Sequence, residues 1–315
     1  MPHLHNMSQA SPDTSSHPHP ASNPLSLCER VVYGLLAALS VLPLWVWRGL
    51  GVTIGHLGYW LLRPRKRIGR INLALCLPEM TQKQRDAILL QHFISMAQTA
   101  LDRIWLWHGS DALLQRRLRL QGDTEALHQD GSILLFAPHF VGLDAGATAL
   151  LRHVAPRKGI TIYTAIRTPA VDRWVRRGRQ RTGNVLVFGR PEGSKPVIYA
   201  LRKNAGLYLL ADMDFGPKES IFCTFFGQTA ATVPSVSRFA KLARARTITA
   251  VTLLEPHGYT THVSPAWSNF PTDDVMADTQ RMNHELEGWI RQRPHEYFWL
   301  HKRFKTRPEG QASVY

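Results

Sequence analysis

Cysteine is scarce in this chain of 315 residues, which contains only Cys28, Cys76 and Cys223. No two of them have the C-x-x-C spacing that redox sites and many zinc sites share. This scarcity argues against a disulfide framework or a zinc site, and it suits a reducing compartment. The chain also lacks a G-x-S-x-G pentapeptide, so a hydrolase with a serine nucleophile at a strand-to-helix turn has no support in the sequence.

Acidic side chains are also in short supply. The chain has 38 Lys and Arg against 23 Asp and Glu, a formal net charge of +15. Such an excess predicts an anionic partner, and nucleic acid, an anionic membrane surface or an acidic carrier protein would each fit. Hydrophobic residues make up 44% of the chain, enough to fill a core, so the sequence is not that of a disordered protein.

The N-terminal region divides into a polar part and an apolar part. Residues 1–26 are rich in Ser, Pro, His and Asn, which predicts a disordered polar tail. Seventeen uncharged residues, Val31–Trp47, and a second apolar run, 49–62, precede the basic cluster at 63–70. This length is close to the minimum for crossing about 30 Å of hydrocarbon. Residues 27–70 are therefore predicted to be a membrane anchor with a basic cytoplasmic exit, and a buried helical hairpin is the alternative.

The rest of the chain, 71–315, is predicted to be one domain of the α/β class. Short apolar runs typical of buried strands alternate with helix-like segments; the runs are ILLFA, ITIYTA, VLVF, LYLLA and TITAVTLL. Alternation at this spacing indicates a central mixed, largely parallel sheet that is covered by helices on both faces.

A histidine and an aspartate follow the first of these runs. Pro138 cannot donate to a β-ladder, so the strand should end there and leave His139 at its carboxyl end, where open α/β sheets bind ligands. Asp144 falls in the first turn of the next helix, and a turn at Gly142 could bring its carboxylate to the imidazole. It would then fix the tautomer and leave the other ring nitrogen free to take a proton. A helix cap beside a structural histidine is the alternative, because H-x4-D is common by chance.

Basic residues gather in the middle of the predicted domain. Between Ala145 and Arg190 there are ten of them against the single acid Asp172. A solvated helix face usually mixes the two signs, so this excess predicts contact with an anion. The residues expected to contact the anionic substrate or carrier are Arg173, Arg176 and Arg177, with Lys302 and Arg303 near the C-terminus.

Four segments carry a resemblance to a known family. They are APHFVGLDAG with its H-x4-D spacing, DMDFGP at 212–217, FFG at 225–227 and YFWLHKRFKTRPEG at 297–310. Together with the apolar N-terminal run, they resemble the late acyltransferases of lipid A biosynthesis, within the glycerolipid acyltransferase superfamily. The resemblance covers roughly Leu27 to the C-terminus, and its last segment is the most specific.

The resemblance implies a bacterial inner-membrane enzyme whose catalytic domain faces the cytoplasm and which uses no cofactor and no metal. It would transfer a fatty acyl chain from acyl carrier protein to a hydroxyl of an acyl chain on a Kdo-lipid A precursor. His139 would be the general base and Asp144 would orient it. The expected partners are the acyl-carrier donor, the lipid acceptor and membrane lipids, and nucleic acid is not expected.

The carbonyl oxygen of the donor develops negative charge, so a nearby cation or backbone donors should stabilise it. The resemblance implies Arg167, at a position usually basic in the family, or Arg179, which begins its later R-x3-G pattern. Arg167 is favoured, although Thr164 stands where many members carry a basic residue. Asp212 and Asp214 are expected close to the site, mainly as hydrogen-bonding groups.

Two other functions remain open. D-x-D, here Asp212 and Asp214, also holds a divalent metal in many glycosyltransferases, so a metal-dependent membrane glycosyltransferase is the main alternative. The other is a non-enzymatic protein that binds anionic lipid or nucleic acid through its arginines. A membrane anchor would bring such a protein to lipid headgroups first. Sensitivity to a chelator would favour sugar transfer, and loss of turnover in His139→Ala would favour acyl transfer.

Overall fold

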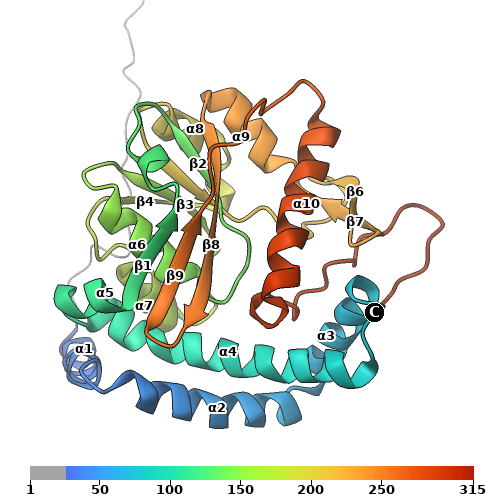
Figure 1. Cartoon of the computed structure of the whole chain (residues 1–315). Coiled ribbons are helices and arrows are strands. Elements are labelled where there is room, and N and C mark those ends of the chain that lie inside the picture. The colour runs from blue at the N-terminus through green and yellow to red at the C-terminus, as the bar shows by residue number, and fades with distance from the viewer. Residues whose placement is uncertain (1–25) are drawn as a thin grey trace, which may run out of the picture.

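The computed structural model describes residues 26–315, and a seven-stranded sheet organises them (Figure 1). The strand order is β1-β9-β8-β2-β5-β3-β4, and β8, β2, β5, β3 and β4 run parallel to one another. β9 is antiparallel to β8 and parallel to β1. The strands are β1 (Leu118–Gly122), β2 (Ile133–Phe136), β3 (Gly159–Tyr163), β4 (Val185–Gly189), β5 (Gly206–Leu209), β8 (Arg246–Glu255) and β9 (Gly258–Val263). The predicted mixed, largely parallel sheet is confirmed.

Helices cover both faces of the sheet, and alternate strand residues point to them. Leu134 and Phe136 of β2 share a core with α8, α9 and α10, whereas Ile133 and Leu135 pack with Leu150 of α6. A strand buried on both faces reads as a continuous apolar run, which is why β2 is visible in the sequence. The helices are α4 (Gln82–His108), α5 (Asp111–Arg117), α6 (Leu143–His153), α7 (Pro169–Arg179), α8 (Lys195–Leu201), α9 (Ser235–Ala243) and α10 (Val275–Gln292).

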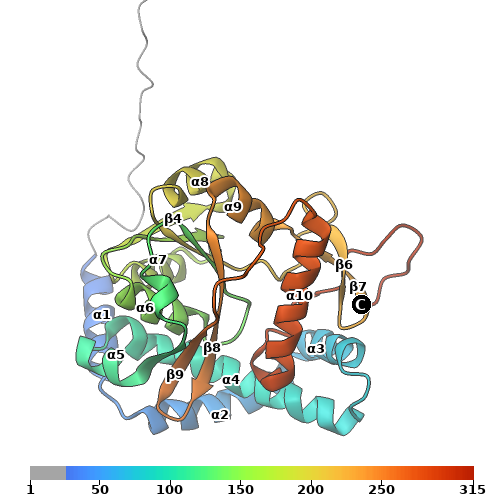
Figure 2. The ribbon, with the colours of Figure 1, turned by 45° about the horizontal axis from the view of Figure 1, so that its top comes forward.

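A small hairpin, β6 (Ile221–Phe225) and β7 (Gln228–Thr232), packs beside α10 (Figure 2). Its two turn residues, Phe226 and Gly227, both have positive φ, of 49° and 72°. Two such residues form the type I′ turn that matches the twist of a hairpin, and glycine adopts this conformation without strain. The FFG segment of the sequence is therefore the turn of this hairpin.

The predicted anchor is folded as two helices, α1 (Leu27–Leu39) and α2 (Leu44–Leu61), whose axes are bent by 109°. The hydroxyl of Ser40 donates to the carbonyl of Ala37 at 2.7 Å, and Pro43 opens the next helix. Because proline has no N–H, it suits a helix start and not a helix interior. No single helix in residues 26–315 is long and apolar enough to cross a membrane, although α1 and α2 taken together have the necessary length and composition. One continuous anchor helix is thus not confirmed, and the predicted polar tail lies outside the described residues except for Ser26.

α2 lies along α4 at the edge of the molecule, as Figures 1 and 2 both show. Glycine makes this contact close: a Cβ on Gly51 would lie 2.8 Å from the Cα of Gln98, and one on Gly55 would lie 2.8 Å from the nitrogen of Ile94. The other side of α1 and α2 exposes large apolar side chains; these include Leu27, Val31, Leu35, Trp45, Leu57, Trp60 and Leu61. The basic cluster forms the start of α3 (Arg63–Cys76), directly after α2.

Candidate active site

His139 lies just beyond the carboxyl end of β2, and Asp212 lies just beyond the carboxyl end of β5. The two strands are neighbours, and Phe136 pairs with Leu209 in their register. His139 and Asp212 each follow their paired residue by three positions. Because parallel strands in register place equal offsets side by side, this pairing brings the imidazole and the carboxylate together. His139 is thus at the carboxyl edge of the sheet, where the sequence predicts it.

Asp212 holds the imidazole in place through both of its oxygens. Oδ1 lies 2.7 Å from Nδ1 of His139, and Oδ2 accepts the backbone N–H of His139 at 2.9 Å. Burial opposes ionisation of Asp212, yet His139 and its hydrogen bonds keep the pKa of this carboxyl below its usual range. A carboxylate at Nδ1 fixes the tautomer and leaves Nε2 as the nitrogen that can accept a proton.

Asp144 is not the partner of the imidazole, and this corrects the predicted contact. It lies in the first turn of α6, where Nε of Arg103 donates to Oδ2 and Nε of Arg179 donates to Oδ1, both at 2.8 Å. Burial would raise the pKa of Asp144, but the two guanidinium groups lower it to about 2. Asp144 is therefore an ionised carboxylate that bridges two arginines from α4 and α7.

Arg103 is not among the residues that the sequence patterns predict for the site. Its signal in the sequence is a charged pair, Asp102-Arg103, inside the otherwise apolar stretch from Ala100 to Trp107. Asp102 explains the other half of that pair: it is buried and accepts from Trp105 Nε1 and from the hydroxyl of Tyr259. One residue of the pair thus fixes α4 to the sheet, and the next reaches the site.

The two candidate oxyanion arginines differ in position. Arg179 lines the same cavity as His139, whereas Arg167 is exposed in the segment before α7 and does not line it. The structure therefore favours Arg179, which reverses the preference drawn from the sequence.

The remaining predicted anion contacts have mixed surroundings. On α7, Arg173 pairs with Glu29 at 2.8 Å and Arg176 pairs with Asp172 at 2.9 Å; Arg177 lies on the same helix. Lys302 is exposed, with Nζ 5.5 Å from the ring centroid of Tyr315.

Arg303 is buried and serves the fold, which corrects its predicted role in anion binding. Its guanidinium donates to the carbonyl of Ala231 at 2.6 Å and to the hydroxyl of Thr232 at 2.7 Å. It thereby fixes the C-terminal segment to β7.

Asp214 ties the D-x-D segment to the C-terminal segment. Its oxygens accept from the backbone N–H and the hydroxyl of Thr306, both at 2.8 Å, and from the N–H of Gly216 at 2.9 Å. Asp212 is occupied by His139, and no group of three or more His, Cys, Asp or Glu within residues 26–315 could hold a metal ion. The two aspartates therefore act as hydrogen-bonding groups in this structure, as the sequence favours.

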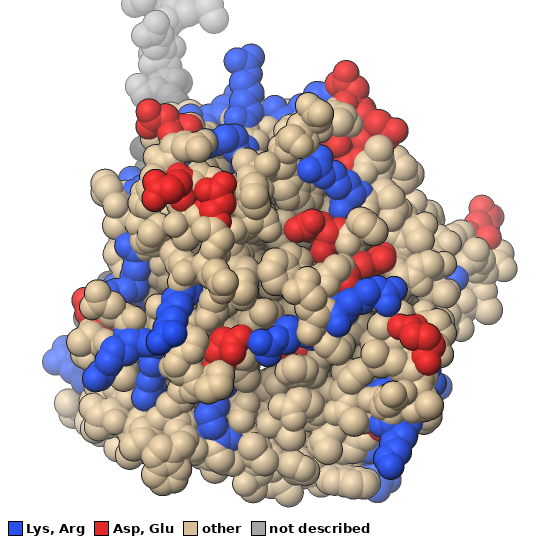
Figure 3. All heavy atoms as spheres, in the orientation of Figure 1, with Lys and Arg blue, Asp and Glu red and all other residues tan. Residues whose placement is uncertain are grey.

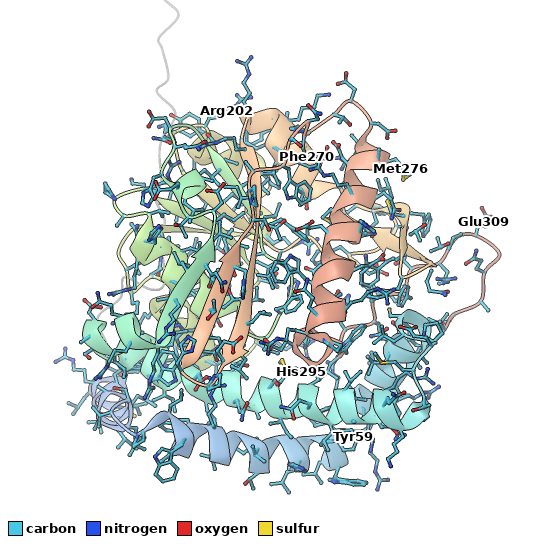
Figure 4. The ribbon with its side chains drawn as sticks, viewed as in Figure 1. Tyr59, Arg202, Phe270, Met276, His295 and Glu309 are labelled. Carbon is cyan, nitrogen blue, oxygen red and sulfur yellow. The ribbon has the colours of Figure 1, made fainter. Side chains whose placement is uncertain are left out.

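The C-terminal signature also supports the backbone around His139. The N–H of Phe298 donates to the carbonyl of His139 at 2.9 Å, and the N–H of Val141 donates to the carbonyl of Glu296, also at 2.9 Å. This strip continues from the 3₁₀ turn at Pro294–Glu296, where His295 lies at the lower end of α10 (Figure 4). The C-terminal signature thus fixes the loop that carries the candidate base.

A cavity of about 770 Å³ opens beside these groups. His139, Asp144, Arg103 and Arg179 line it together with many aliphatic and aromatic side chains from the sheet, α6 and α7. The side chain of His139 is 24% exposed, so the imidazole is accessible from this cavity. The arrangement offers a proton acceptor, two fixed cations and an apolar space, which together suit a reaction on a lipid-like substrate.

Comparison with known proteins identifies the family. The sequence model described as "Bacterial lipid A biosynthesis acyltransferase" matches residues 23–306. A lipid A biosynthesis lauroyltransferase of Escherichia coli (strain K12) is 30% identical over 290 residues, which cover 90% of this chain and 92% of that protein. A lipid A biosynthesis myristoyltransferase of the same organism is 30% identical over 271 residues, covering 84% and 82%. A palmitoleoyltransferase of that organism is 28% identical over 290 residues, covering 88% and 92%.

The chain belongs to the bacterial lipid A biosynthesis acyltransferase family. It is therefore an acyltransferase, and acyl transfer onto lipid A is its class of reaction.

Proposed function

We propose that this protein transfers a fatty acyl chain from acyl carrier protein to a hydroxyl of an acyl chain on a Kdo-lipid A precursor. The single observation that carries this proposal is the imidazole of His139, held by Asp212 beside a large and mainly apolar cavity. Within residues 26–315, the imidazole of His139 is hydrogen-bonded to Asp212 and to no serine or cysteine, which suits direct attack by a substrate hydroxyl.

The reaction needs one proton transfer in each direction. Nε2 of His139 removes the proton from the acceptor hydroxyl as its oxygen attacks the thioester carbonyl carbon. The C–S bond then breaks, the ester remains on the acceptor, and the imidazolium returns the proton to the departing carrier thiolate. Asp212 stabilises the imidazolium and holds it in the correct tautomer during both steps.

The negative charge on the carbonyl oxygen is stabilised by the arginines that Asp144 holds. Arg179 and Arg103 both line the cavity, and their bonds to Asp144 keep the two guanidinium groups at fixed positions. Cations positioned before the reaction stabilise a developing oxyanion without reorganisation. Asp144 is thus a positioning residue that sets the geometry of the cations.

The donor and acceptor are both anionic, and the excess of basic residues supports this choice. Phosphates and Kdo carboxylates of the acceptor, and the acidic surface of the carrier, would meet the arginine-rich face of α7 and the exposed Lys302. The metal-dependent glycosyltransferase alternative has less support, because Asp212 and Asp214 are committed to His139 and Thr306.

The proposal is tested with purified protein, a Kdo-bearing precursor in mixed micelles and matched donors. We expect the acceptor to gain the mass of one acyl chain from the acyl-carrier donor, with the new ester on an acyl hydroxyl. A chelator should leave the rate unchanged, and nucleotide sugars should give no product. Transfer of a sugar, or no acyl transfer from any carrier-bound chain, would reject the proposal.

We further propose that the protein works at the cytoplasmic face of the bacterial inner membrane. The exposed apolar side chains of α1 and α2 support this. Few charged side chains appear along the lower edge of the molecule in Figure 3, where α2 lies. No acidic residue occurs between Arg30 and Pro78. Arg48 and Arg70 pair with Asp102 and Asp86 of α4, whereas the exposed Arg63 and Arg67 of the basic cluster would face anionic lipid headgroups.

A pair of substitutions on α2 tests this membrane contact. Leu57 and Leu61 are 55% and 74% exposed, and replacing both with Glu should weaken binding to anionic vesicles roughly a hundredfold, because two large side chains leave the hydrocarbon. The measurement is flotation with vesicles of known composition. Tyr199→Glu on α8, 64% exposed, is the matched control and should bind as the wild type does. Equal binding of the double variant would place the membrane contact elsewhere.

A further inference from the structure

The cavity extends along the sheet from His139, at the carboxyl edge of the strands, to the amino-terminal end of β5. Gly206, the first residue of β5, lines it together with Gly159, the first residue of β3. The far part is also lined by Leu151, Val154 and Lys158, whereas His139 lines the near part. The lining therefore connects the candidate base with the amino-terminal edge of the strands.

The strand register gives the length of this path. Gly206 pairs with Ile133 and with Gly159, so the three residues are level with one another. His139 follows Ile133 by six positions, so the chain between them spans at most about 20 Å. One leaflet of a bilayer, the thickness that a long fatty chain fills, is about 15 Å deep. The distance from the base to Gly206 therefore suits a long acyl chain.

The register also gives the face on which the path lies. Directly paired residues of parallel strands point to the same face, and Ile133 packs in the core between the sheet and α6. A Cβ on Gly159 would collide with the side chain of Leu151 in α6. A side chain at position 206 would therefore point toward α6. Leu135 and Tyr208 share this face: both line the cavity, Leu135 belongs to the core between the sheet and α6, and Tyr208 packs against that core.

Gly206 differs from Gly146 of α6 and from Gly159 of β3 in the space around it. A Cβ added to Gly206 meets no atom within 4 Å, whereas one added to Gly146 would collide with Thr252. The backbone of Gly206 does not have positive φ, so another residue fits there without strain. Neither close packing nor backbone conformation requires a glycine at position 206.

We propose that Gly206 determines the length of the acyl chain that the enzyme transfers. The missing side chain leaves the space into which the terminal methylenes of the chain extend, between β5 and α6. A larger side chain would occupy that space and favour a shorter donor. This inference rests on the proposed function, because it requires the donor chain to occupy the cavity.

The test is a series of variants, Gly206→Ala, Gly206→Val and Gly206→Leu, assayed with carrier-bound donors of graded chain length. We expect the preferred length to shorten as the side chain grows. Activity with the wild-type donor should fall roughly tenfold or more for each methylene that no longer fits. Shorter donors should keep their activity in every variant, which shows that the fold and the site are intact.

Gly288→Leu is the matched control. A Cβ on Gly288 also meets no atom within 4 Å, but this glycine is on α10 and does not line the cavity. Its chain-length profile should equal that of the wild type. If Gly206→Leu retains the wild-type profile, or loses all chain lengths equally, the inference is wrong although acyl transfer stands. Failure of the wild type with every carrier-bound chain would instead reject the proposed function.

Discussion

Replacing Asp212 with Asn is expected to lower kcat by about 10³- to 10⁴-fold while KM changes little. The amide oxygen can still accept the backbone N–H of His139, so the NH₂ group comes to lie against Nδ1. Nδ1 must then act as the acceptor, and the proton moves to Nε2, the nitrogen that should take the proton from the acceptor hydroxyl. Steady-state kinetics with varied donor and acceptor measure the effect, and His139→Ala provides the rate without a base.

Asp214→Asn is the matched control for that experiment. Asp214 belongs to the same segment and is equally buried, but it accepts from Thr306 and Gly216 and not from His139. We expect this change to lower the midpoint of thermal unfolding more than it lowers kcat. If Asp212→Asn retained kcat within tenfold of the wild type, Asp212 would not be the group that orients the base.

The position of His139 could be predicted from the sequence, whereas its partner could not. An apolar run that ends at a proline marks the end of β2, and this local pattern places the histidine at the carboxyl edge of the sheet. Asp212 is 73 residues further along, after β3 and β4. Its contact depends on β5 inserting between β2 and β3, and strand order is set by the packing of the whole domain. The nearer acid, Asp144, therefore matches the H-x4-D pattern in the sequence, but in the structure it pairs with two arginines and not with His139.

The same reasoning applies to the N-terminal region. Pro43 is visible in the sequence as a poor residue for a helix interior, but the direction of the chain after it is not. α2 runs along α4 because Gly51 and Gly55 allow it to approach Gln98 and Ile94, and these contacts join segments about 40 residues apart. Hydropathy alone cannot separate a helix that crosses a bilayer from one that packs on its own domain with one face exposed.

Replacing Asp144 with Asn is expected to lower both stability and turnover, because it leaves two neighbouring guanidinium groups without a counter-charge. The pKa of Asp144 is about 2 in the folded protein and close to its ordinary value of 3.8 in the unfolded chain, a difference that corresponds to about 2 kcal/mol. A lowered pKa stabilises the folded state above pH 4, and this contribution is lost as the pH falls from about 4 toward 2. The wild type should therefore lose more unfolding free energy than Asp144→Asn over that range.

The measurement is urea unfolding at a series of pH values, combined with kinetics at neutral pH. We expect kcat to fall roughly a hundredfold, since fixed cations supply part of the stabilisation of the oxyanion and mobile ones supply less. Arg103→Lys separates charge from geometry: it keeps the cation but replaces the planar donor group, so it should lower kcat while the acid-dependent stability largely remains. Asp144→Asn with normal kcat and an unchanged dependence of stability on pH would mean that the bridge between Arg103 and Arg179 serves neither the reaction nor the fold.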